Sequence, residues 1–100
     1  SKAIVNYPKQ VFKMYGGKIR KVRLSFDESL IGIMFNKFGK EISIKKYGSR
    51  FTASVEVQIS PTFWGWLTQF PAKMEIMSPV DVKKAYAAWV RSAIESEELT

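Results

Sequence analysis

The sequence predicts one α+β domain in which amphipathic helices cover one side of an antiparallel sheet. Three observations lead to this prediction. The chain has 100 residues, 46% of them apolar, which suits one domain with a modest core. Residues 18–26 and 51–59 alternate between apolar and polar side chains, as half-buried strands do. After each of these segments the apolar residues change to the spacing of a helix.

The first strand and helix are predicted between residues 18 and 39. Val22, Leu24 and Phe26 alternate with polar residues, which indicates a half-buried strand. Asp27 then caps a helix, and Gly39 is placed to end it in a left-handed conformation. The apolar residues at helical spacing are Leu30, Ile31, Met34, Phe35 and Phe38.

A hairpin is predicted next. Ile42 and Ile44 alternate with polar residues in a second strand, and Gly48-Ser49 suits a tight two-residue turn into the third. The third strand points one set of polar side chains away from the core: Thr52, Ser54, Glu56 and Gln58.

An aromatic helix follows the hairpin. Ser60 is the expected N-cap, Pro61 fits the first helical position, and the helix is expected to end near Phe70-Pro71. Trp64 lies off the apolar stripe. The stripe contains Phe63, Trp66, Leu67 and Phe70.

The last strand and helix complete the domain. KMEIM at residues 73–77 predicts a short fourth strand, and Ser78-Pro79 opens a final helix. We expect residues 95–100 to fray. The apolar stripe of this helix is predicted at Val82, Ala85, Tyr86, Trp89, Val90 and Ala93.

This order of elements is that of the ferredoxin-like, or split βαβ, fold with an additional C-terminal helix. Both helices of the βαββαβ unit are expected on one face of a four-stranded antiparallel sheet, in the order 4-1-3-2. The domain is expected to span residues 18–100. Residues 1–17 are expected to be a linker or the end of an upstream domain.

The composition excludes several kinds of chemistry. The chain has no cysteine and no histidine, which removes disulfides, thiolate catalysis, the Ser-His-Asp triad and the commonest metal ligand. We therefore expect neither an enzyme nor a metal or cofactor site. No apolar run is long enough for a membrane span and no signal peptide is apparent, so a cytoplasmic protein is expected.

Positive charge is concentrated in the first half of the chain. Residues 1–50 carry twelve Lys and Arg against three acids, which gives +9, and residues 51–100 carry four against six, which gives −2. Such an asymmetry favours nucleic acid or an acidic partner surface. The alternative is a basic face turned toward a neighbouring domain.

Four stretches of the chain resemble the WCX domain, the C-terminal extension of bacterial WYL-domain transcriptional regulators. They are MYGGKIRKVRLSF, FNKFGKEISI, VEVQISPTFWGWLTQF and KMEIMSPVDVKKAYAAWVRSAIE, and the resemblance covers residues 12–94. Its most specific residues are Ser60, Phe63, Gly65 and Trp66, followed by Pro79 and Val82. The stretch Phe70-Pro71-Ala72 is a departure, because relatives tend to have glycine after the aromatic residue.

The resemblance implies a ferredoxin-like module in a regulator that also contains a winged helix-turn-helix and an Sm-like barrel, the WYL domain. It implies a homodimer in the full-length protein, DNA binding through upstream domains, and a small-molecule or nucleic-acid effector. The expected function is dimerisation and coupling of effector sensing to DNA binding. The alternatives are a small-ligand sensor and a single-stranded nucleic-acid-binding module.

Trp64 is a candidate interface residue because it lies off the apolar stripe of its helix, about 100° around the helix from Phe63. Gly65 interrupts the same helix, and close approach by another backbone would explain it. Thr68 lies alongside Trp64, and the apolar residues Phe12 and Tyr15 complete the candidate interface. The alternative for Trp64 is incidental exposure.

Lys21, Arg23 and Lys45 are candidate basic contacts, because alternation points them out of the open sheet face. Glu56 and Glu75 share that face and would repel phosphates. We therefore expect a solvated or partner-covered face in preference to direct nucleic-acid binding.

Overall fold

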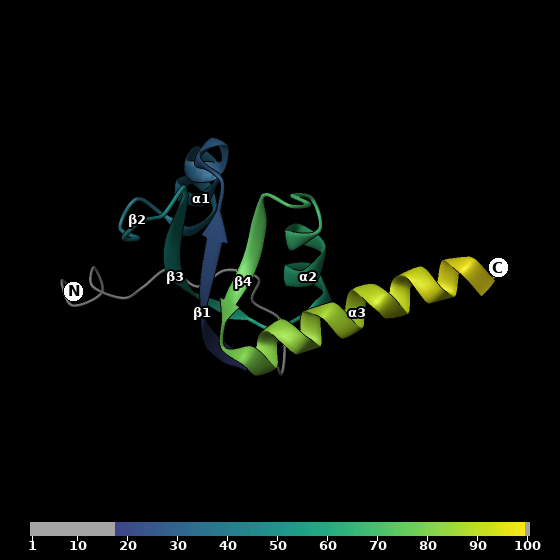
Figure 1. Cartoon of the computed structure of the whole chain (residues 1–100). Coiled ribbons are helices and arrows are strands. Elements are labelled where there is room, and N and C mark those ends of the chain that lie inside the picture. The colour runs from purple at the N-terminus through teal and green to yellow at the C-terminus, as the bar shows by residue number, and fades with distance from the viewer. Residues whose placement is uncertain (1–17, 100) are drawn as a thin grey trace.

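A computed structural model describes residues 18–99 of the chain (Figure 1). The predicted linker at residues 1–17, with Phe12 and Tyr15, therefore lies outside the described residues. The elements are β1 (Ile19–Phe26), the 3-10 helix η2 (Glu28–Leu30), α1 (Ile31–Phe38), β2 (Lys45–Tyr47), β3 (Arg50–Gln58), α2 (Pro61–Leu67), β4 (Met74–Ser78) and α3 (Val80–Leu99).

The four strands form one antiparallel sheet in the order β2-β3-β1-β4. This order is the predicted 4-1-3-2 read from the opposite edge, so the α+β class and the antiparallel sheet are confirmed. The two central strands, β1 and β3, pair along their full length, from Ile19 opposite Gln58 to Phe26 opposite Phe51. β4 joins the other side of β1 with a shift of register between Arg23 and Leu24.

One apolar core fills the space between the sheet and the helices. Alternate residues of β1, β3 and β4 contribute to it, as the period-two pattern predicts. Phe38 of α1 meets Trp66 of α2 edge to face, with ring centroids 5.5 Å apart, so the two helices pack side by side. The side chains with the least exposure are Phe26, Phe63, Leu24, Met34, Ile76, Val22 and Val57.

Both predicted helix caps are present. The Asp27 carboxylate accepts hydrogen bonds from the backbone N–H of Ser29 at 2.9 Å and from its hydroxyl at 2.6 Å, and these bonds lower the pKa of Asp27. Ser60 Oγ accepts from the N–H of Phe63 at 3.4 Å, with Pro61 in the first turn of α2. Gly39 ends α1 as predicted, but its ψ of 160° lies outside the left-handed helical region.

The hairpin turn is confirmed, but its first strand is shorter than predicted. Gly48 has a φ of 65°, and Tyr47 and Arg50 pair directly across the two-residue turn. The ladder then ends at the pair of Lys45 and Thr52. The predicted strand residues Ile42 and Ile44 lie before β2 and pack against the core, so their alternation reflects burial and not pairing.

The aromatic helix also ends earlier than predicted, at Leu67. The Thr68 hydroxyl donates to the carbonyl of Gly65 at 2.7 Å, and turns carry the chain from there into β4. After Thr68 the backbone bonds tighten to a spacing of three residues, from the N–H of Gln69 to Trp66 and from that of Phe70 to Leu67. Ala72 then adopts a φ of 66°, a left-handed conformation that favours glycine.

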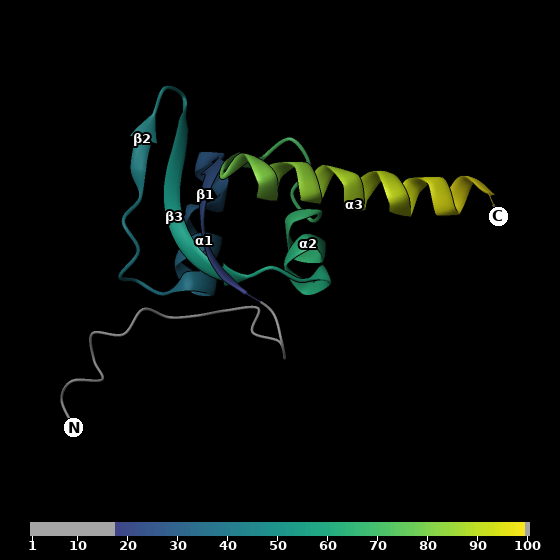
Figure 2. The same cartoon turned by 90° about the horizontal axis from the view of Figure 1, so that it is seen from below.

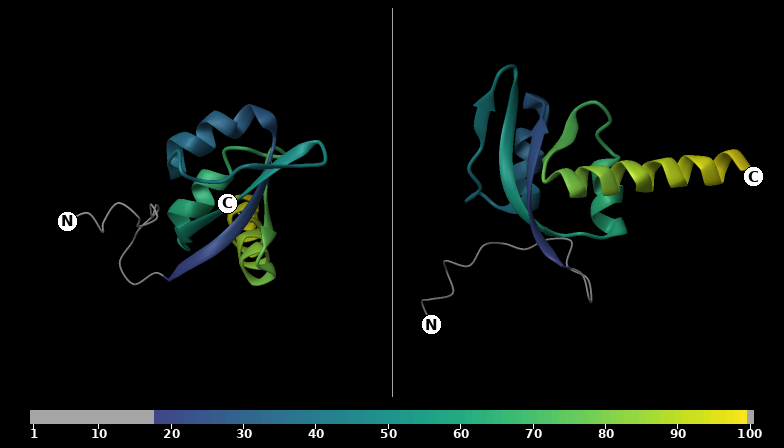
Figure 3. Two further views of the ribbon diagram at one scale, coloured as in Figure 1. Left: turned by 90° about the vertical axis from the view of Figure 1, so that its left-hand side faces the viewer. Right: turned by 60° about the horizontal axis from the view of Figure 1, so that its bottom comes forward.

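The C-terminal helix α3 leaves the body of the domain and projects past α2 (Figures 1 and 3). Val82 is buried, and the ring of Tyr86 lies 5.4 Å from that of Trp64 on α2. The predicted stripe residues Ala85 and Ala93 are exposed. The prediction that residues 95–100 fray is wrong for residues 95–99, which are helical.

The first turn of α3 is joined to β1 by an ion pair. The two terminal guanidinium nitrogens of Arg20, Nη1 and Nη2, donate to the two carboxylate oxygens of Asp81 at 3.0 and 3.1 Å. This interaction raises the pKa of Arg20 and lowers the pKa of Asp81.

Candidate functional site

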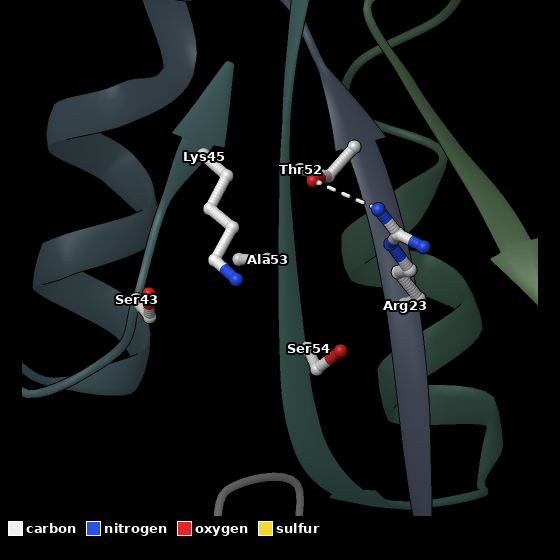
Figure 4. Close-up of a pocket in the computed structure, with 6 residues that line it drawn as sticks. All are labelled: Arg23, Ser43, Lys45, Thr52, Ala53 and Ser54. Carbon is white, nitrogen blue, oxygen red and sulfur yellow. Dashed lines mark hydrogen bonds between the residues drawn. The ribbon is translucent and has the colours of Figure 1, made fainter. Parts of the chain in front are cut away.

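A polar pocket opens on the face of the sheet that points away from α1 and α2 (Figure 4). It has a volume of about 370 Å³. The residues that line it are Arg23, Ser43, Lys45, Thr52, Ala53 and Ser54. The lining therefore contains two cations and three hydroxyl groups, and no acid.

The register of the sheet brings these side chains together. Arg23 on β1 lies opposite Ser54, and Lys45 on β2 lies opposite Thr52. Directly opposed side chains in antiparallel strands have Cβ atoms about 5 Å apart. In Figure 4 the Lys45 side chain extends over the gap between β2 and β3, and the Ser54 hydroxyl points toward Arg23.

The pocket lies where the ladder between β2 and β3 stops. Residues 42–44 are not part of β2, so β3 has no β2 partner beyond Thr52. Ser43 lines the pocket from this segment while its neighbours Ile42 and Ile44 pack against the core. The early end of the ladder thus makes room beside Ala53 and Ser54.

Two neighbours hold the Arg23 guanidinium in place. Its Nη2 donates a long hydrogen bond of 3.5 Å to the hydroxyl of Thr52, and its central carbon lies 5.9 Å from the centre of the Tyr47 ring. Tyr47 remains 58% exposed, so an aromatic surface borders the pocket. In the described part of the chain no carboxylate forms an ion pair with Arg23 or Lys45.

A second arginine covers the neighbouring part of the same face. Arg50 donates from Nε to the Ser25 hydroxyl at 2.9 Å and from Nη2 to the Ser25 carbonyl at 3.2 Å. Its Nη1 also donates to the carbonyl of Ala72 at 3.2 Å. The guanidinium of Arg50 is therefore occupied within the fold, whereas Arg23 makes one long hydrogen bond to Thr52.

The predicted basic contacts separate into two groups. Arg23 and Lys45 both line the pocket, whereas Lys21 lies two residues along β1, directly opposite Glu56. An acid next to Lys21 compensates its charge, so the positive charge is concentrated at the β2 side of the face. The sequence analysis placed Thr52 and Ser54 on this face but gave them no function. It did not identify Ser43 as a pocket residue or Tyr47 as a neighbour of Arg23. The register set by the turn at Gly48-Ser49 could have placed Lys45 beside Thr52.

Trp64, the central residue of the predicted interface, is buried within the domain. Trp64 is 6% exposed and is covered by Tyr86 of α3, which a helical projection of α2 alone does not include. A Cβ atom on Gly65 would meet none of the described atoms within 4 Å, so the packing within residues 18–99 gives no reason for this glycine. Thr68 is exposed, and its hydroxyl bonds to its own helix.

An exposed apolar side chain lies on the projecting part of α3, the residues that follow Trp89. Trp89 and Val90 are half-buried, and Ile94, one turn beyond Val90, is 53% exposed. Trp89 still packs against the core, and Val90 and Ile94 continue the stripe of Val82 and Tyr86 beyond it. Figure 2 shows this part of the helix extending away from both α2 and the sheet.

Two other kinds of site can be addressed for the described residues. No group of three His, Cys, Asp or Glu residues there is arranged to hold a metal ion. None of the helices in residues 18–99 combines the length and apolar character that a membrane span needs.

No protein-family model matches the chain, and no curated protein matches it.

Proposed function

We propose that this chain is a cytoplasmic, non-enzymatic regulatory and dimerisation module of the WCX type. In this proposal it adopts the ferredoxin-like βαββαβ fold and belongs to a WYL-domain transcriptional regulator. It would couple effector sensing to DNA binding by upstream domains. The strand order and the alternation of helices with strands support the fold, and the quoted sequence stretches support the family.

One observation carries the dimerisation role: the apolar stripe of α3 continues beyond its contacts with the rest of the domain. An isolated helix of this size is marginally stable in water, and most helices in proteins are stabilised by packing of an apolar face. Beyond Trp89, which packs against the core, this face contains Val90 and Ile94. A second copy of α3 would cover that stripe with an equivalent one, as two-fold dimers do.

Sedimentation equilibrium of the 100-residue chain tests this role. The wild-type chain is expected to dimerise at micromolar concentrations, and Ile94→Glu is expected to weaken dimerisation at least tenfold, because it places a charge in the apolar contact. Ser92→Glu is the matched control, since it introduces the same charge two residues away on the polar side of α3. Circular dichroism verifies that both variants keep their helix content.

A wild-type chain that stays monomeric at hundreds of micromolar would contradict dimerisation through this domain alone. Equal weakening by Ile94→Glu and Ser92→Glu would contradict the role of the stripe and indicate a general effect of charge.

A further inference from the structure

We propose that the pocket on the polar face of the sheet binds a phosphomonoester, the terminal phosphate of a small metabolite or mononucleotide, between Arg23 and Lys45. This ligand adds to the dimerisation role and does not depend on it, because every residue of the pocket belongs to one copy of the chain.

Charge is the first argument for this ligand. The two cations of the pocket have no carboxylate partner in the described part of the chain. A phosphomonoester carries a charge of about −1.5 to −2 at neutral pH, which two cations match. Arginine binds phosphate oxygens through two parallel hydrogen bonds, and lysine contributes a point charge from the other side.

The hydroxyl groups provide the second argument. Ser43, Thr52 and Ser54 approach the pocket from two different segments of the chain and can each donate a hydrogen bond to a phosphate oxygen. Thr52 is only 3% exposed, and its side chain also accepts from Arg23. Five donor groups therefore converge from both sides of β3, where a phosphate has three terminal oxygens to satisfy.

The size and border of the pocket limit the rest of the ligand. A volume of about 370 Å³ lies at the lower end of the range for small-molecule sites. It suits a phosphate with one attached ring. The exposed ring of Tyr47 stands next to Arg23 and offers a surface on which a planar group can stack.

The charges outside the pocket disfavour a nucleic-acid strand. Glu56 follows Ser54 on the same face of β3, and Glu75 lies opposite Ser25 on β4. A polyanion laid across the sheet would approach both carboxylates, whereas a single phosphate at the β2 side would not. Each internal phosphate of a strand also carries only one charge.

The test uses the isotope-labelled 100-residue chain and follows its backbone amide NMR signals during titration. The probes are ribose 5-phosphate, adenosine 5′-monophosphate, 3′,5′-cyclic adenosine monophosphate, adenosine, and oligothymidine without a terminal phosphate. The two monoesters are expected to shift the signals of Ser43, Lys45, Thr52 and Ser54. The cyclic diester and adenosine are expected to bind at least tenfold more weakly, because the diester carries one negative charge and adenosine carries none.

Matched variants locate the effect. Lys45→Met is expected to weaken binding of adenosine 5′-monophosphate about tenfold, the usual size of one lost charge-assisted hydrogen bond. Lys46→Met removes the same charge from the next residue, which points to the other face of β2, and is expected to leave the affinity unchanged. Lys45 is exposed on an edge strand, so its replacement leaves the fold intact.

Three results would overturn the proposal. The first is a titration in which the monoesters shift no signals of the pocket residues at any concentration. Lys45→Met and Lys46→Met could weaken binding equally, which would show nonspecific attraction to a basic surface. Oligothymidine could bind the same residues as tightly as the mononucleotide, which would make the face a nucleic-acid surface.

Discussion

The two faces of the sheet bury their residues in different ways. On the core face, Val22, Leu24 and Phe26 are fully covered by apolar side chains from the helices. On the opposite face, Ser25 and Thr52 are 5% and 3% exposed. Their neighbours on that face are long polar side chains of the sheet itself.

Arg50 and Arg23 account for this burial. Arg50 lies across Ser25 and bonds to both its hydroxyl and its carbonyl, and Arg23 reaches Thr52. Arginine can cover a surface with its aliphatic stem while its head stays hydrated. A sheet face that no helix covers can therefore still bury polar residues beneath long side chains of its own strands. Hydrogen-bond donors on this face that have no partner within the fold are available to a ligand.

The comparison predicts that a truncation in the apolar core, between the sheet and the helices, has the largest effect. Phe63→Ala should lower the free energy of unfolding by about 3–5 kcal/mol, because Phe63 has no exposed surface and a cavity would remain. Urea unfolding measures the loss. Val80→Ala, at a residue that is 63% exposed, is the control and should change stability by less than about 0.5 kcal/mol. A similar loss in both variants would contradict the assignment of the core.

On the polar face, Arg50→Met should cost about 1–3 kcal/mol, because it leaves the buried hydroxyl of Ser25 without its donor. Arg50→Lys keeps the charge but cannot reproduce bonds to Ser25 and Ala72 together, so it should recover only part of the loss. Chemical denaturation measures the free energy of unfolding of the wild type, Arg50→Met and Arg50→Lys. Full recovery by lysine would show that charge alone matters on this face.

A substitution at Ala72, whose carbonyl accepts a hydrogen bond from Arg50, should have a smaller and stabilising effect. Ala72→Gly should raise the free energy of unfolding by about 0.5–1 kcal/mol, because glycine removes the cost of the left-handed conformation and loses part of that gain to its own flexibility. Thermal unfolding measures the gain. Ala88→Gly, in the middle of α3, is the opposite control and should destabilise the chain.

The exposed ion pair at the start of α3 should have the smallest effect, because surface pairs contribute little. The pKa of Asp81 is lowered in the folded chain, so its stabilisation is present above the unfolded pKa of about 3.9 and is lost as pH falls through the folded value. The advantage of the wild type over Asp81→Asn should therefore appear at neutral pH and vanish in acid. Unfolding curves at both pH values test this, and a difference that grows in acid would contradict it.

Local patterns were sufficient to predict most of the elements. Alternation identified β1 and β3, the caps at Asp27 and Ser60 located the helix starts, and Gly48-Ser49 identified the hairpin. These features depend on residues a few positions apart in the chain. The polar direction of Arg23 and Lys45 follows from the same alternation.

The errors arose where distant parts of the chain decide the outcome. Trp64 is off the stripe of its own helix, but α3 packs against that side through Tyr86. Ile42 and Ile44 alternate like a strand although they are buried without pairing. The pocket depends on the register between β1 and β3, which places Arg23 opposite Ser54, and no short-range pattern sets that register.

The projecting part of α3 has a mechanical consequence. A helix rises about 1.5 Å and turns about 100° per residue, so α3 is a rigid arm of about 30 Å whose base is fastened to β4. A partner that binds the C-terminal end of α3 is therefore held at a fixed distance from the sheet and in a fixed orientation around the helix axis. Adding one alanine after Arg91 would barely lengthen this arm, but it would swing everything beyond that point by more than a quarter turn.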